Sequence, residues 1–143
     1  MRIENDREYR ITGAWLRRFK QDFERLQNTP LGDEHPRSRK AQLDALESQI
    51  EDLRDQMQEY EALRNKQVHS ADVSSLEELP DALIQARIAA GLTQEQLAER
   101  LNLKKQQIQR YEATRYASAS LERLTQIAKA LGVQIKAEVV FGQ

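Results

Sequence analysis

A short stretch around residue 108 carries the side chains best suited to reading another molecule. A helix predicted over residues 105–112 turns Ile108 and Tyr111 inward and presents amides and cations outward, namely Lys105, Gln106, Gln109 and Arg110. Glutamine and arginine form paired hydrogen bonds that suit the edges of adenine and guanine in the major groove of DNA. Ordinary solvated helices also carry such residues, so this face indicates DNA binding only together with the elements that position it.

The charge distribution places positive charge around the same helix. The chain has 22 basic and 23 acidic residues, a formal net charge of −1. Residues 1–72 hold 13 Lys and Arg against 15 Asp and Glu, whereas residues 73–143 hold 9 against 8. Within residues 104–136 there are seven cations and two anions. The local excess therefore lies where a DNA surface would need it.

Two short predicted helices lead up to this face. Pro80 suits the first turn of a helix, which carries an apolar stripe and ends at Gly91, where a left-handed residue is needed. Thr93 caps the next helix, residues 94–101, and forms a capping box with Gln96. The predicted stripe of the first helix consists of Ala82, Leu83, Ala86 and Ala90.

The second of these helices is joined to the outward-facing helix by a tight turn at residues 102–104. Ala98 faces the following helix, where a small side chain allows close approach. A last helix is predicted over residues 120–131, with an apolar stripe of Leu121, Leu124, Ile127, Ala128 and Leu131.

The C-terminal tail has the period of a β-strand. From Val133 to Phe141, apolar residues alternate with polar ones, which predicts a short strand within residues 133–143. An isolated strand leaves backbone groups unpaired, so we expect it to pair with the same strand of a second chain or with residues 1–11. The alternative is a frayed tail.

Residues 87–98, Arg-Ile-Ala-Ala-Gly-Leu-Thr-Gln-Glu-Gln-Leu-Ala, followed by Ile108-Gln-Arg-Tyr-Glu112, closely resemble the Cro/C1-type (XRE) helix-turn-helix family. The resemblance implies a five-helix, lambda-repressor-like domain that binds DNA. It implies base contacts from Lys105, Gln106 and Arg110, to which the outward face adds Gln109. The expected phosphate contacts are Thr93, Gln94, Lys104, Arg115, Tyr116 and Ser118.

The same resemblance implies that Arg87 and Glu112 form an internal salt bridge, so we interpret both residues as structural. The sequence departs from the family at Ala113-Thr114, where the family usually has Asn-Gly. The geometry of the following loop and its phosphate contacts are therefore the least determined part of the expected site.

Two amphipathic helices are predicted before this domain. Thr12 is a plausible N-cap for a helix of about 15 residues that ends before Asn28. After a connector with two prolines and a glycine, residues 37–64 form a longer helix with an apolar seam spaced by three and four. The seam consists of Leu43, Leu46, Ile50, Leu53, Met57 and Tyr60.

These two helices are expected to fold back as an antiparallel hairpin. Because the second predicted helix is much longer, part of its seam lacks a partner, which favours a homodimer; the alternative is packing on the chain's own C-terminal domain. The predicted organisation is an N-terminal helical hairpin over residues 1–66, a linker over 67–75, the helix-turn-helix domain over 76–132 and a C-terminal strand over 133–143.

Enzyme, cofactor and metal sites find no support in the sequence. His35 and His69 are the only histidines, both in predicted loops without ligand spacing, and no phosphate-cradling glycine loop is present. The chain has no cysteine, no apolar run of membrane-spanning length and no signal peptide, which fits a cytoplasmic protein without a membrane segment.

The whole chain is similar to HigA-type antitoxins of bacterial toxin–antitoxin operons. That resemblance implies a protein that represses its own operon by binding double-stranded operator DNA and that also grips a protein toxin. Two alternatives stay open. One is a plain transcriptional repressor whose hairpin only dimerises, and the other is a transcription adaptor resembling multiprotein bridging factors.

Overall fold

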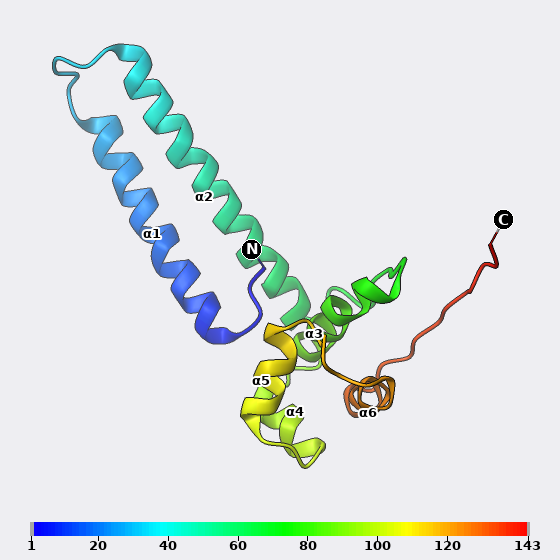
Figure 1. Cartoon of the computed structure of the whole chain (residues 1–143). Helices are drawn as coiled ribbons and strands as arrows, with labels where there is room; N and C mark the ends of the chain where they lie inside the picture. Colours follow the sequence, from blue (N-terminus) through cyan, green and yellow to red (C-terminus); the bar gives the residue numbers. More distant parts are fainter. Residues whose placement is uncertain (1, 143) are drawn as a thin grey trace. The chain divides into compact units, whose positions relative to one another are not determined.

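The computed structural model describes residues 2–142 and divides into two compact units, Met1–Ala62 and Leu63–Gln143 (Figure 1). Within the described residues the regular structure is helical throughout, so the prediction of a mainly α protein is confirmed. None of the helices in residues 2–142 combines the length and apolar character needed to cross a membrane.

The first unit is a pair of antiparallel helices, α1 (Asp6–Asn28) and α2 (Pro36–Arg64), as predicted (Figure 1). The expected start of α1 at Thr12 is wrong. The side chain of Asn5 accepts a hydrogen bond from the Glu8 backbone N–H at 2.8 Å, and no helix breaker separates it from Thr12. The two helices therefore have 23 and 29 residues, and the difference in length between them is smaller than the sequence indicated.

Tyrosine side chains join α1 and α2 near the N-terminus of α1. The Tyr60 hydroxyl donates to Asp6 at 2.8 Å, and the Tyr9 hydroxyl donates to Glu61. The two tyrosine rings lie 5.3 Å apart between centroids. These contacts fix the register of the antiparallel pair, because each joins residues more than 50 positions apart in the sequence.

A buried arginine holds the connector at the other end of the pair. Arg39, 8% exposed, donates from Nη1 to the carbonyl oxygens of Leu26 at 2.8 Å and Thr29 at 2.7 Å. Its Nε donates to Glu34 at 2.8 Å. The guanidinium thus satisfies carbonyl groups that the end of α1 leaves without intrahelical donors.

The second unit contains a 3₁₀ turn, η1 (Leu76–Glu78), and four α-helices: α3 (Leu79–Ala89), α4 (Gln94–Arg100), α5 (Lys105–Ala113) and α6 (Leu121–Leu131). The expectation of five helices is therefore wrong for α-helices, of which the described residues of this unit form four; the fifth helical element is the single 3₁₀ turn η1. The centre of the unit is formed by side chains less than 2% exposed, namely Leu83, Ile84, Leu97, Ile108 and Ile127.

Two predicted core positions of this unit are wrong. Ala90 is exposed, and the buried face of α3 carries Ile84 and Ile88, whose larger side chains remove more apolar area from water than alanine does. Leu121 is 75% exposed because it is the first residue of α6, whose buried face begins further along the helix.

The C-terminal tail forms no strand up to residue 142, so that prediction is wrong for the single chain. The tail is extended but has no partner strand to complete its backbone hydrogen bonds (Figure 1). Ile135, Val139, Val140 and Phe141 are all more than half exposed.

Candidate nucleic-acid interface

The turn between α3 and α4 is closed by glycine and threonine. Gly91 has a φ of +74°, and the Leu92 N–H donates to the Arg87 carbonyl at 3.2 Å, which completes a left-handed helix end. Thr93 then begins α4 with the predicted capping box. Its hydroxyl accepts from the Gln96 N–H at 3.0 Å, and the Gln96 side chain accepts from the Thr93 N–H at 2.9 Å.

The turn between α4 and α5 is equally well defined. Asn102 has a left-handed φ of +55°, a conformation that asparagine tolerates, and the Leu103 N–H donates to the Ala98 carbonyl at 2.9 Å. Ala98 is 1% exposed. Its small side chain lets α4 and α5 pack closely, so the predicted tight turn fixes where α5 begins.

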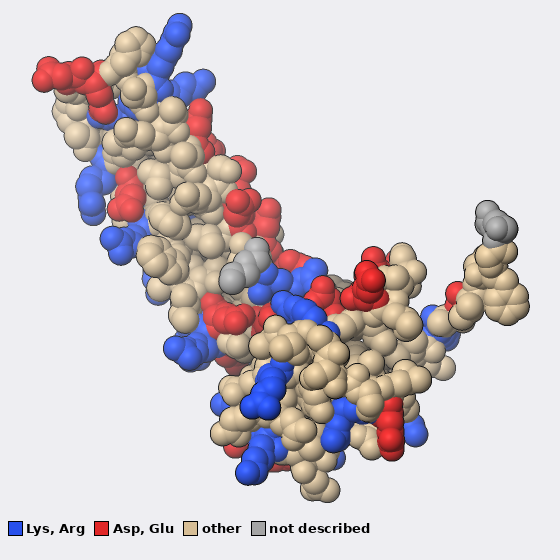
Figure 2. All heavy atoms as spheres, in the orientation of Figure 1, with Lys and Arg blue, Asp and Glu red and all other residues tan. Residues whose placement is uncertain are grey.

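Helix α5 presents one polar face to solvent and buries the other. Ile108 is fully buried, whereas Lys104 and the four residues expected to read bases, Lys105, Gln106, Gln109 and Arg110, are exposed. Basic side chains spread over the part of the surface that α4 and α5 occupy in Figure 2. The structure thus brings the expected base-reading residues together on one helix face that a ligand can reach.

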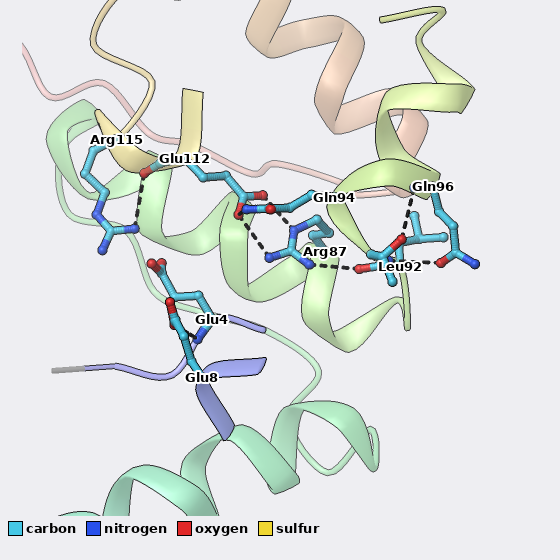
Figure 3. A network of polar contacts seen from close by, with 9 residues as sticks. Glu4, Glu8, Arg87, Leu92, Gln94, Gln96, Glu112 and Arg115 are labelled. Atoms are coloured by element: carbon cyan, nitrogen blue, oxygen red, sulfur yellow. Dashed lines mark hydrogen bonds and ion pairs between the residues drawn. The ribbon is translucent and has the colours of Figure 1, made fainter. Parts of the chain in front are cut away.

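A buried ion pair holds α3 against α5. Arg87 and Glu112 are each 3% exposed, with Nε to Oε2 at 2.6 Å and Nη2 to Oε1 at 3.0 Å (Figure 3). Arg87 Nη1 also donates to the Leu92 carbonyl at 2.9 Å. This is the pairing that the family resemblance implied, and it places both side chains inside the domain rather than on its outward face.

Gln94 extends this cluster to the start of α4. Its Nε2 donates to Glu112 Oε1 at 2.9 Å, so the buried carboxylate accepts from Arg87 and Gln94 together (Figure 3). A primary amide carries two N–H donors. We therefore keep the expectation that Gln94 uses its second donor on a phosphate, next to Thr93 at the end of the same helix.

The loop after α5 contains two consecutive residues in the left-handed region, Arg115 at φ +53° and Tyr116 at φ +57°. Arg115 and Ser118 are exposed, as a phosphate contact requires. Arg115 Nε lies 3.5 Å from Asp81 Oδ1, an ion pair that no spacing in the sequence indicated. The loop shape replaces the Asn-Gly geometry that the family usually has after the glutamate.

Tyr116 does not fit the role expected of it. It is 4% exposed, and its ring stacks on Tyr111 with centroids 5.6 Å apart. Burial raises the pKa of the Tyr116 hydroxyl above its usual value of 10.0, and the nearby Glu112 carboxylate raises it further. A side chain held in the interior is unsuited to a phosphate contact, so we interpret Tyr116 as part of the core.

Other kinds of site find no support in residues 2–142. No group of three potential metal ligands occurs there, and both histidines are exposed. The residue that sequence reasoning missed most clearly is Arg39 of the first unit, whose role depends on carbonyl groups more than one helical turn away.

Comparison with known proteins identifies the second unit. Residues 83–136 match the family model described as helix-turn-helix, a range that begins in α3 and ends after α6. No curated protein and no solved structure matches the chain. The chain therefore carries a helix-turn-helix domain of the Cro/C1 (XRE) type, and the first unit lies outside the matched range.

Proposed function

We propose that this protein is a sequence-specific transcriptional regulator that reads operator DNA with the exposed face of α5. The observation that carries the proposal is the combination of the helix-turn-helix match with an exposed row of amide and cationic side chains on α5. Lys105, Gln106 and Arg110 contact bases, with Gln109 beside them. Thr93, Gln94, Lys104, Arg115 and Ser118 contact phosphates.

The proposal is tested by selecting bound duplexes from a random DNA library. The wild-type protein is expected to enrich one motif with two related half-sites about one helical turn apart, since regulators of this architecture bind as two-fold dimers. Enrichment of no motif, together with equal affinity for all duplexes, would contradict sequence-specific recognition.

We further propose that the regulator is the antitoxin of a toxin–antitoxin operon. The supporting observation is a separate helical unit, Met1–Ala62, that precedes the DNA-binding domain and lies outside the matched range. A plain repressor needs that unit only for dimerisation, and an adaptor resembling bridging factors would use it for the transcription machinery.

Co-expression with the product of the adjacent gene separates these functions. An antitoxin is expected to relieve growth arrest caused by that product and to copurify with it. A neighbour that is harmless when expressed alone would favour the plain repressor, and copurification with RNA polymerase would favour the adaptor.

A further inference from the structure

Helix α1 carries an apolar stripe that α2 leaves half exposed. Ile11 is 48% exposed and Trp15 is 47% exposed, and Phe19 continues the same row at a spacing of four. The Trp15 and Phe19 rings stack with centroids 5.7 Å apart, and the Arg18 guanidinium lies 5.6 Å from the Trp15 ring. These contacts order the stripe before any partner binds.

Helix α2 carries an uncharged stripe on the same side of the pair. Trp15 directly precedes buried Leu16, and Gln49 directly precedes buried Ile50. One residue back along a helix is a turn of about 100° around its axis. Because the two helices are antiparallel and pack through Leu16 and Ile50, this turn brings Trp15 and Gln49 to the same side of the pair. The uncharged stripe of α2, at spacings of three and four, consists of Gln42, Ala45, Gln49, Leu53 and Gln56.

The two helices carry opposite charges. Residues 7–20 of α1 contain five cations and one anion, whereas residues 44–61 of α2 contain seven anions and one cation. In Figure 2 an uncharged strip runs along the helix pair between a mainly basic edge on α1 and an acidic edge on α2. A surface with an uncharged centre and opposite charges on its two edges is complementary to itself.

We propose that this face, defined by the α1 stripe and the α2 stripe, binds the same face of a second copy of the chain. The two-fold axis runs parallel to the helices. Such an axis places α1 of each chain over α2 of the other and forms an antiparallel four-helix bundle. An axis perpendicular to the helices would instead place basic α1 over basic α1.

The register of α1 against α2 determines which charged residues face each other in the proposed dimer. A Cβ on Gly13 would lie 3.4 Å from Met57 Cε, so these residues are level across the hairpin. Arg18 lies five residues further along α1, and Asp52 lies five residues back along α2, so they are level too.

Arg18 and Asp52 are both exposed. Each lies two residues after the buried residue of its helix, Leu16 or Ile50, so the two side chains point outward on opposite edges of the pair. Rotation about an axis parallel to the helices leaves each residue at the same height along the bundle and places the basic edge of one chain over the acidic edge of the other. Arg18 of each chain therefore meets Asp52 of the other.

The geometry also places both chain exits together. Helices keep their direction under an axis parallel to them, so the C-terminal ends of both α2 helices lie at one end of the bundle. Both linkers, residues 65–75, then leave from that end toward their DNA-binding domains. This arrangement suits a palindromic operator, but the dimer forms without DNA.

The apolar part is tested by measuring the mass of the full chain in solution over a range of concentrations. Wild-type protein is expected to be dimeric, and Ile11→Ser/Trp15→Ser is expected to weaken the dimer at least about thirtyfold, as loss of a tryptophan anchor does. Leu76→Ser is the control, because Leu76 is 83% exposed and lies outside the hairpin. A monomeric wild type, or an equal effect of the control, would overturn the proposal.

The axis is tested by charge reversal. Arg18→Glu alone and Asp52→Arg alone are each expected to weaken the dimer about tenfold, and the double variant is expected to restore it. With α1 over α1, Arg18 would instead face the basic side of the other α1, so Arg18→Glu would not weaken the dimer; single variants without a weakening effect would therefore overturn the proposed axis. Gln106→Ala/Arg110→Ala is expected to stay dimeric, so failure of dimerisation and failure of DNA binding are distinguishable.

Discussion

Removing the Glu112 carboxylate should destabilise the helix-turn-helix domain severely. The side chain accepts three hydrogen bonds in a site that is 3% exposed, two from Arg87 and one from Gln94. Glu112→Ala leaves the Arg87 guanidinium buried without its carboxylate, and breaking such a pair costs about 3–5 kcal/mol. The cost is a large part of the about 5–15 kcal/mol by which domains are stable.

The assay is thermal unfolding followed by circular dichroism. At about 4–8 °C per kcal/mol for a domain of this size, Glu112→Ala should lower Tm by at least about 12 °C. Asp81→Ala is the matched control, because Asp81 pairs with Arg115 at 3.5 Å while both side chains are about half exposed. Its cost should be about 1 kcal/mol or less.

The cause of the loss is tested by replacing both partners. Arg87→Met/Glu112→Leu removes the charges together and should recover much of the stability that Glu112→Ala loses, because no buried charge is left unpaired. If Glu112→Ala and Asp81→Ala lowered Tm equally, the argument that the buried pair locks α3 to α5 would be refuted.

Three further predictions concern the loop after α5 and the tail. Arg115→Gly should be about 1 kcal/mol more stable than Arg115→Ala, because glycine adopts φ +53° without strain, and equal stabilities would argue against strain there. Both variants should make DNA affinity less dependent on salt concentration, by about one phosphate contact. Because the pKa of Tyr116 is raised by folding, its contribution to stability is present below the unfolded value of 10.0 and is lost as the pH rises past that value. The free energy of unfolding, measured in urea, should therefore fall less steeply between pH 8 and about pH 11 in Tyr116→Phe than in the wild type. An equally steep fall in the variant would assign the loss to other groups. Deleting residues 133–143 should leave the protein dimeric, with a mass in solution of two truncated chains, whereas a monomeric product would make the tail the dimer contact.

Local signals in the sequence determined much of the second unit. Gly91, Thr93 with Gln96, and the turn at residues 102–104 each act over a few residues, so α4 and α5 begin close to where they were predicted. The outward face of α5 followed from its period alone. The Arg87–Glu112 contact spans 25 positions and could be expected only through the family resemblance.

The features that sequence reasoning missed depend on contacts between elements. Arg39 reads as a solvated helix residue until the end of α1 brings carbonyl groups beside it. Tyr116 reads as a loop residue until Tyr111 and the interior enclose it. The tail has the period of a strand, but a strand also needs a partner edge, which its own pattern cannot supply.

The central claim is that the exposed face of α5 reads base sequence, and it is tested most directly by comparing two paired variants on the selected operator. Gln106→Ala/Arg110→Ala removes two exposed residues four apart on α5, and Arg54→Ala/Gln58→Ala removes the same two residue types at the same spacing on the exposed surface of α2. The α5 pair should lose about 1–3 kcal/mol of discrimination per contact and relax specificity at the matching positions, while the α2 pair should bind as wild type does. Unchanged operator affinity and specificity in the α5 pair would contradict the account.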